Sequence, residues 1–263
     1  MQSGTERTES GGLASFACML ADLARPMALE HFRQNIAVEQ KADLSPVTYA
    51  DRAIEAAMRA LIEKTYPDHG ILGEEHGTSN IDSARVWVLD PIDGTKSFVT
   101  GMPTFGTLIA LLEDGRPTLG VISIPPTGEL WIGRDGEATL FDSVACHTST
   151  CTKLADALVY TTSPDNFDVA GLKAFDRVSS QAAMRRYGGD CYSYGLLASG
   201  HIDAVIEMNL QPYDFMALVP VTEGAGGVIT DWQGGRLHLG SDGHVVAAAT
   251  PELHAEILEA LYA

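Results

Sequence analysis

The chain has 263 residues, enough for one large domain or two smaller ones that share a core. Its 17 basic and 35 acidic residues give a net charge of −18, which argues against nucleic acid or an anionic membrane surface as a partner. No apolar run of the roughly 20 residues that span a bilayer stands out.

The N-terminal segment and the cysteines indicate the compartment. Residues 1–11 are polar and predict a flexible tail, without the basic and apolar regions of a secretory signal. The cysteines are scattered and form no CxxC pair: Cys18, Cys146, Cys151 and Cys191. Reduced thiols in a chain without a signal predict a cytoplasmic protein.

Apolar periodicity predicts α+β organisation over residues 12–145. Helices are expected over residues 12–37 and from Thr48 onward. A strand should end at Asp90, where Pro91 would stop the ladder. The other strands expected in this half cover residues 71–72, 105–112, 119–124 and 130–133.

A polar, irregular stretch over residues 143–156 marks a boundary, and residues 146–263 then read as an α/β half. Strands are expected over residues 158–161, 184–187, 204–207, 228–230 and 245–248. Helices are expected over residues 169–178, 191–199, 215–225 and 252–262. Two sheets with helices between and outside them would bury this much apolar sequence.

The segment from Asp90 to Thr95 is the most informative for chemistry. Asp90 and Asp93 flank a tight turn, so their carboxylates can converge on hard cations, and the Ile92 carbonyl can add a neutral oxygen. The amides of Gly94 and Thr95, at a predicted helix start, can receive phosphate oxygens. An isolated DxxDG would more often be a cap and a turn, but other acidic groups accompany this one.

Two further acidic positions have competing interpretations. Glu74 and Glu75 follow a short strand and Gly73, so one of them could be a metal ligand, although paired glutamates usually form a solvated loop. Asp214 precedes an apolar helix and could be either a ligand or an N-cap.

Three motifs in this order resemble the inositol monophosphatase superfamily of metal-dependent phosphatases. They are Gly73-Glu-Glu75, Asp90-Pro-Ile-Asp-Gly-Thr95 and Tyr213-Asp214, and the match extends from about residue 12 to the C-terminus. Three stretches look closest to the histidinol-phosphate phosphatase branch: Lys41-Ala-Asp-Leu-Ser-Pro-Val-Thr48, Tyr187-Gly-Gly-Asp-Cys-Tyr192 and Pro212-Tyr-Asp-Phe215.

The resemblance implies a layered αβαβα sandwich and a homodimer. It implies metal positions at Glu74, Asp90, Ile92, Asp93 and Asp214, the one at Ile92 through its carbonyl. Mg²⁺ is favoured because every expected ligand is an oxygen, and two or three ions are expected.

The resemblance also implies catalytic and substrate positions. Glu74 and Thr95 are expected to orient the attacking water, with Asp51 supporting Thr95. Asp93, Gly94 and Thr95 are expected to bind the substrate, with the amides of Gly94 and Thr95 at its phosphate. Glu207 falls where related enzymes touch the organic part of the substrate.

Charge extends this expectation to Asp190, because histidinol phosphate carries an ammonium group and an imidazole. Asp190 and Glu207 could receive them, although Asp190 could instead be an N-cap and Glu207 a surface charge.

The leading hypothesis is therefore a Mg²⁺-dependent phosphatase that hydrolyses histidinol phosphate, a small metabolite of histidine biosynthesis. Alternatives with the same chemistry are an inositol monophosphatase or broad sugar-phosphate phosphatase, and a 3′-phosphoadenosine 5′-phosphate phosphatase. A catalytically silent metal-binding regulatory protein is the alternative from another class. The combination of Glu74, Thr95 and Asp51 argues against that last alternative, since a pure binder needs no water-orienting groups.

Overall fold

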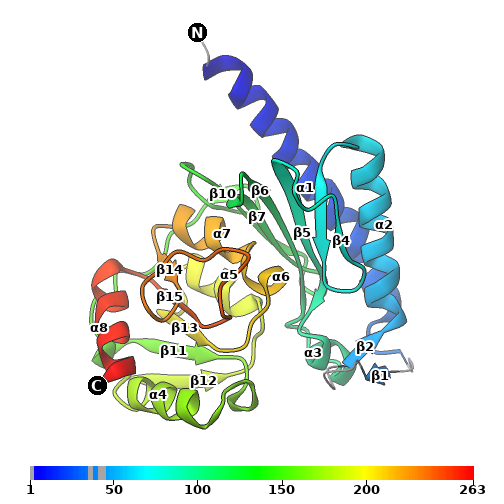
Figure 1. Cartoon of the computed structure of the whole chain (residues 1–263). Coiled ribbons are helices and arrows are strands. Elements are labelled where there is room, and N and C mark those ends of the chain that lie inside the picture. The colour runs from blue at the N-terminus through cyan, green and yellow to red at the C-terminus, as the bar shows by residue number, and fades with distance from the viewer. Residues whose placement is uncertain (1–2, 35–37, 41–45) are drawn as a thin grey trace.

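A computed structural model of the chain describes residues 3–34, 38–40 and 46–263. Layers of helix and sheet alternate through the molecule in the order αβαβα (Figure 1). The expected layered fold is confirmed.

The larger sheet has eight strands in the order β10-β9-β8-β7-β6-β5-β3-β4. All pairs are antiparallel except β3 with β5. Its strands are β3 (Gly70–Gly73), β4 (Gly77–Ser79), β5 (Arg85–Asp93), β6 (Gly106–Glu113), β7 (Arg116–Ile124), β8 (Glu129–Arg134), β9 (Leu140–Phe141) and β10 (Val144–Ala145).

The smaller sheet has five strands in the order β12-β11-β13-β15-β14. In it, β11 is parallel to both β12 and β13, and the other pairs are antiparallel. Its strands are β11 (Leu158–Thr161), β12 (Met184–Tyr187), β13 (Ala204–Glu207), β14 (Val228–Thr230) and β15 (Val245–Ala248). A separate antiparallel pair joins β1 (Val38–Gln40) to β2 (Pro46–Thr48).

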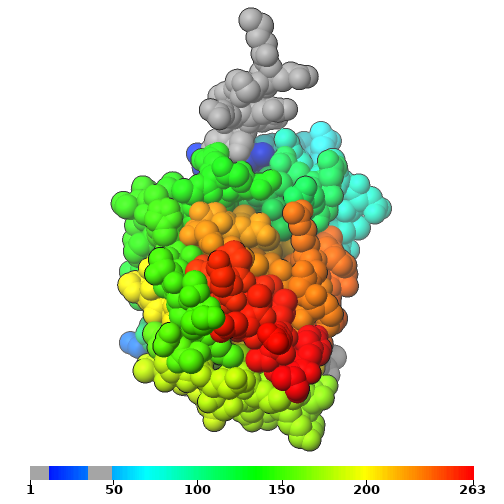
Figure 2. Space-filling view, turned by 90° about the vertical axis from the view of Figure 1, so that its left-hand side faces the viewer, coloured from blue at the N-terminus to red at the C-terminus, as the bar shows by residue number. Residues whose placement is uncertain are grey.

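The helices form the outer and middle layers. They are α1 (Ser3–His31), α2 (Tyr49–Thr65), α3 (Thr95–Thr100), α4 (Val169–Ser179), α5 (Tyr192–Ala198), α6 (Pro212–Phe215), α7 (Leu218–Gly224) and α8 (Pro251–Tyr262), with 3₁₀ turns at Leu154–Asp156 and Pro164–Asn166. Helices α1 and α2 cover one face of the larger sheet, and α5 to α7 lie between the sheets. On the far side α8 lies beside α4 at the surface (Figure 2).

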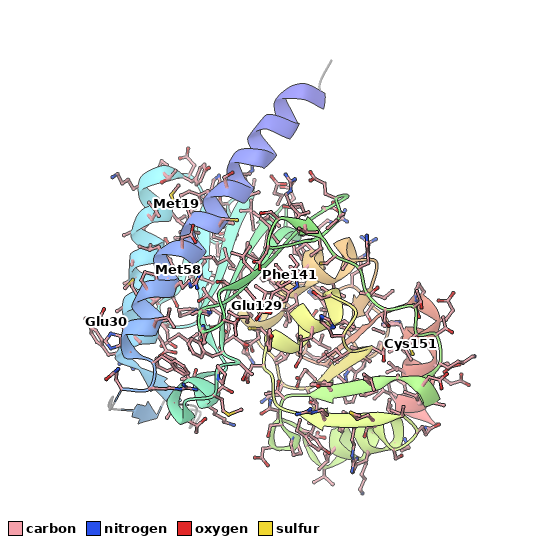
Figure 3. The ribbon with its side chains drawn as sticks, turned by 180° about the vertical axis from the view of Figure 1, so that it is seen from behind. Met19, Glu30, Met58, Glu129, Phe141 and Cys151 are labelled. Atoms are coloured by element: carbon pink, nitrogen blue, oxygen red, sulfur yellow. The ribbon has the colours of Figure 1, made fainter. Side chains whose placement is uncertain are left out.

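Three apolar cores lie between these layers and hold them together. The first lies between α1, α2 and the larger sheet and contains Met58, whereas Met19 on α1 is exposed (Figure 3). The middle core joins the two sheets through Leu108 of β6 and Val205 of β13. The third lies under α4 and α8. Because both sheets contribute to the middle core, this core fixes the position of one sheet against the other.

Helix α1 differs from the prediction at both ends. It begins at Ser3 rather than residue 12 and ends at His31, while residues 1–2 and 35–37 lie outside the described residues. Extending a helix that is already packed costs little, which is why the polar segment can continue it. The expectation about spanning length also needs correction, since Gly12–His31 is apolar and long enough to cross a membrane by length and composition. However, 44% of that stretch is buried inside the protein, as in a core helix.

Two other expectations about helices and loops change. The helix expected over residues 215–225 is two helices, α6 and α7. Pro220 lies in the first turn of α7, where its missing N–H breaks no helical hydrogen bond. Part of the loop expected around Pro46 forms the β1–β2 pair, and residues 41–45 of that motif lie outside the described residues.

Candidate active site

Strand β5 places two aspartates at the edge of the larger sheet. It runs through to Asp93, so the expectation that Pro91 ends the strand is wrong. Pairing with β6 shifts between Asp90 and Asp93, and the amide of Ile92 donates to Oδ1 of Asp90 at 3.0 Å. Pro91 is tolerated because it lies at this irregularity, where the ladder needs no N–H.

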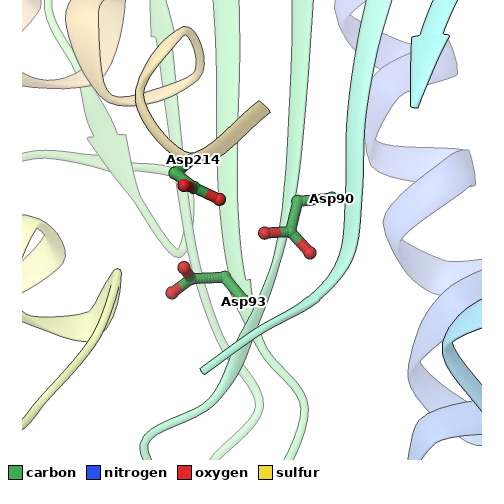
Figure 4. Close-up of side chains that lie close together, drawn as sticks. All are labelled: Asp90, Asp93 and Asp214. Carbon is green, nitrogen blue, oxygen red and sulfur yellow. The ribbon is translucent and has the colours of Figure 1, made fainter. Parts of the chain in front are cut away.

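Asp214 approaches the same point from the opposite layer. It lies at the third position of α6 and accepts a hydrogen bond from the Gln211 amide at 2.7 Å, so Gln211 is the N-cap and the N-cap interpretation of Asp214 is wrong. The carboxylates of Asp90, Asp93 and Asp214 point toward one another (Figure 4), and one oxygen from each lies within 4.8 Å of the others.

Two of these carboxylates, those of Asp90 and Asp93, are costly to ionise where they lie. The pKa of Asp90 is raised well above its ordinary value, first by burial and then by Glu74, Asp93 and Asp214. The pKa of Asp93 is also raised well above its ordinary value, by burial and by Asp190 and Asp214. A cation among these oxygens would relieve both costs, so the residues fit a site for hard metal ions.

The two adjacent glutamates after β3 have different roles. The side chain of Glu74 lies within hydrogen-bonding reach of Asp90 and also lines the cavity at the cluster. Glu75 is turned toward α2, with its Oε2 4.0 Å from Nε of Arg52. Of the pair, Glu74 is therefore the one that the fold brings to the aspartates.

Gly94 and Thr95 form the turn that follows β5. Gly94 has a positive φ of 81° and precedes α3, which begins at Thr95. The hydroxyl of Thr95 donates to the carbonyl of Ile92 at 3.3 Å, so this hydroxyl holds the carbonyl that was expected to face a metal. Asp51 is buried in the first turn of α2, and it is not among the described residues that line the cavity.

Asp190 and Cys191 link the C-terminal half to the metal cluster. The amide of Cys191 donates to Oδ2 of Asp93 at 2.6 Å. Oδ2 of Asp190 accepts from the hydroxyl of Ser97 on α3 at 2.6 Å. The N-cap interpretation of Asp190 is wrong, because Cys191 occupies that position in α5. Burial raises the pKa of the Asp190 carboxyl, and hydrogen bonding to Ser97 partly offsets this effect.

Glu207 ends β13 inside the protein. It is 1% exposed and accepts hydrogen bonds from the Thr161 hydroxyl at 3.0 Å, the Thr162 amide at 2.7 Å and the Thr162 hydroxyl at 2.8 Å. Burial raises its pKa to about 7 despite these hydrogen bonds. Glu207 is therefore not the surface charge that a strand end would suggest.

A cavity of about 230 Å³ connects these groups. Its wall includes Glu74, Asp93, Gly94, Thr95, Asp190, Glu207 and Asp214, all of which were expected at the site. It also includes residues that sequence reasoning missed: Lys96, Thr162, Ser163, Asn166, Tyr194 and Asn209. For Thr162 and Ser163, the signal in the sequence was the alternation of strands and helices, which favours parallel strands. The structure pairs β11 with β13 in parallel, so the residues after Thr161 lie near Glu207.

Comparison with known proteins agrees with this arrangement. A model described as the inositol monophosphatase family matches residues 12–263. The chain belongs to the inositol monophosphatase family.

Named relatives within the inositol monophosphatase family include different phosphatases. The chain is 46% identical over 263 residues to the bifunctional phosphatase IMPL2, chloroplastic, of Arabidopsis thaliana, covering 97% of this chain and 76% of the relative. It is 36% identical over 254 residues to histidinol-phosphatase of Mycobacterium tuberculosis, covering 94% and 96%. The solved structure of an inositol monophosphatase from Zymomonas mobilis has a TM-score of 0.89 and 45% identity, with 100% of both chains covered.

Membership makes the chain a phosphatase of the inositol monophosphatase type, which acts on small phosphorylated substrates. The family is generally metal-dependent, and the acidic cluster agrees with that property.

Proposed function

We propose that this phosphatase hydrolyses histidinol phosphate to histidinol and phosphate with Mg²⁺ as its cofactor. The single observation that carries the choice of substrate is the acidic wall of the cavity. Asp190 and Glu207 line the same cavity as Asp93 and Asp214. A substrate with a phosphate at one end and cationic groups at the other matches a cation-filled cluster that faces further carboxylates.

The metal would be held by Asp90, Asp93 and Asp214 together with Glu74 and the carbonyl of Ile92. Oxygen ligands favour Mg²⁺ over softer metals, and we propose two or three ions. When bound, such ions lower the pKa of water and stabilise the charge on the leaving oxygen.

The protein groups around the cluster would orient the reactants. Glu74 and Thr95 would position the attacking water, with Asp51 supporting Thr95 from α2. The amides of Gly94 and Thr95 would contact the phosphoryl end, and Asp93 would contact the substrate beside the metal cluster. Asp190 and Glu207 would receive the ammonium and the imidazole, and a charged hydrogen bond of that kind is worth about 1.5–3 kcal/mol.

The test measures phosphate release with Mg²⁺ from four substrates. They are histidinol phosphate, inositol 1-phosphate, fructose 1,6-bisphosphate and 3′-phosphoadenosine 5′-phosphate. We expect the highest kcat/KM on histidinol phosphate. A clear preference for one of the other three would overturn the substrate assignment but not the phosphatase chemistry, and no turnover of any of them would favour a silent metal-binding protein.

Substitution of Asp190 tests the reason for the preference. Asp190→Asn should lower kcat/KM for histidinol phosphate about tenfold to a hundredfold, since one charged hydrogen bond is lost. Hydrolysis of glycerol phosphate, which has no cationic group, should change little. Asp135→Asn, the same change at an exposed position, is the matched control. Equal losses on both substrates would mean that Asp190 serves the fold or the metals.

Inositol monophosphate is the second candidate substrate. The Zymomonas mobilis structure, which is described as an inositol monophosphatase, matches the whole chain at 45% identity. The relative described as a bifunctional phosphatase also leaves room for more than one substrate. We also propose that the protein is cytoplasmic and that it forms a homodimer. Light scattering, which measures the mass of the particle in solution, tests the homodimer.

A further inference from the structure

A buried ion pair on α2 contacts the turn that follows Glu74. Glu55 is 0% exposed and Arg59, one helical turn later, is 9% exposed. Nε of Arg59 donates to Oε1 of Glu55 at 2.7 Å. Neither side chain lines the cavity in the described part of the chain, so the pair has no direct contact with the reaction.

The carboxylate of Glu55 holds the backbone of the turn. Its Oε2 accepts from the amide of Glu75 at 2.6 Å, and its Oε1 accepts from the amide of His76 at 3.1 Å. Arg59 adds a third hydrogen bond to this segment, because its Nη2 donates to the carbonyl of Gly77. The pair therefore binds the segment between β3 and β4 directly after Glu74.

The close approach of α2 to this segment is visible at Gly73. A Cβ added at Gly73 would lie 2.1 Å from Oε1 of Glu55, so only glycine fits beside the carboxylate. On the other side, the Glu74 amide donates to the carbonyl of Leu89 in β5 at 3.2 Å. Glu74 is thus fixed by β5 before the turn and by Glu55 immediately after it.

The structure assigns Glu55 and Arg59 as positioning residues that set the place of Glu74 at the metal cluster. Charged groups are costly to bury, and this pair offsets the cost by satisfying each other and three backbone groups of one short turn. Groups that orient a metal ligand typically change metal affinity about tenfold to a hundredfold when they are lost. The assignment rests on the proposed metal site and is independent of the substrate.

The test is the affinity of the folded protein for Mg²⁺, measured by titration calorimetry without substrate. Glu55→Gln keeps the size of the side chain but removes the charge that holds the two amides. We expect its Kd for Mg²⁺ to rise about tenfold to a hundredfold. Glu63→Gln makes the same change at an exposed position of the same helix and should leave the Kd unchanged.

Two further variants cover the case in which Glu55→Gln does not fold. Arg59→Lys keeps the charge but loses the fork that reaches Gly77, and Gly73→Ala displaces the carboxylate without removing it; both should raise the Kd. Wild-type Kd values in the folded variants would overturn the assignment, because a merely structural role lowers the unfolding temperature alone. If the wild-type protein itself binds no Mg²⁺, the failure belongs to the proposed metal site.

Discussion

Glu207 shows how one buried carboxylate can couple the substrate cavity to pH. Its pKa in the folded protein is about 7, above its ordinary value of 4.5. The folded state therefore binds the proton more tightly than the unfolded state does. Its contribution to stability is present below pH 4.5 and is lost as the pH rises through about 7.

We expect Glu207→Gln to remove this part of the pH dependence. Between pH 4.5 and 7 the free energy of unfolding of the metal-free wild type should fall relative to the variant by about 3 kcal/mol. Denaturant unfolding of both proteins at several pH values measures the difference, in which other titrating groups cancel. If the free energies of unfolding of the wild type and the variant instead change in parallel with pH, Glu207 titrates near its ordinary pKa.

Asp90 gives the second prediction at this scale. Asp90→Asn removes one of the carboxylates proposed to hold Mg²⁺, so kcat/KM should fall about a thousandfold, the loss of several kcal/mol of metal stabilisation. The same change relieves charge repulsion from Glu74, Asp93 and Asp214, so the metal-free variant should be at least as stable as the wild type. Activity assays and thermal unfolding check both parts. Near-normal turnover at saturating Mg²⁺ would refute the metal assignment.

At the scale of elements, the contact between α7 and the larger sheet depends on small residues. A Cβ at Gly120 of β7 would lie 2.0 Å from the carbonyl oxygen of Ala217, just before α7. Gly133 of β8 faces the backbone of Pro220 in the same way. The helix can approach the sheet this closely only because these positions lack side chains.

Gly120→Ala should therefore lower the free energy of unfolding by about 1–3 kcal/mol or more, as overpacking does. Activity should fall as well, since Ala217 lies only three residues from Asp214. Gly12→Ala, where a Cβ has open space, is the control and should be neutral or slightly stabilising. Equal unfolding midpoints for both variants would show that α7 can shift without cost.

The accuracy of the sequence prediction differs between kinds of element. The strands of the smaller sheet are confirmed at the predicted bounds, and four of the five are short apolar runs between polar loops. The exception is β12, an exposed edge strand with two arginines. Strands β4, β9 and β10 were missed because they are only two or three residues long and mostly exposed. Break points such as that between α6 and α7 depend on packing between sheets, which local periodicity does not record.

The candidate site divides in a similar way. The sequence motifs identified the aspartates that the fold brings together, because strand ends and helix starts fix where those residues lie. The bond between Asp190 and Ser97 joins residues 93 positions apart, and no local pattern indicates it. Glu55 was missed because a glutamate on an amphipathic helix usually faces solvent, whereas this one is fully buried.

For the whole molecule, the metal cluster should act as a stabilising link. Asp90 and Asp93 come from the larger sheet, and Asp214 comes from the layer between the sheets. A ligand bound only by the folded state adds about 2.7 kcal/mol of stability at 100 times its Kd.

We therefore expect Mg²⁺ to raise the unfolding temperature in a single transition. NaCl at the same ionic strength is the control, because salt screens the net charge of −18 without filling the cluster. Calorimetric scans compare the two salts. A rise with NaCl as large as that with Mg²⁺ would indicate general screening rather than binding.

The segment between Ala145 and Leu158 is the only stretch of chain that leads from one sheet to the other in the part that the structure describes. The middle core and the hydrogen bond from the Cys191 amide to Asp93 also join the two halves of the chain. Neither of these contacts requires the peptide segment between Ala145 and Leu158 to be intact. A chain cut within this segment should therefore give two fragments that are insoluble apart and recover phosphatase activity when they are produced together. The ligands of the cluster would then come from separate polypeptides, so the association of the two fragments should become stronger when Mg²⁺ is added.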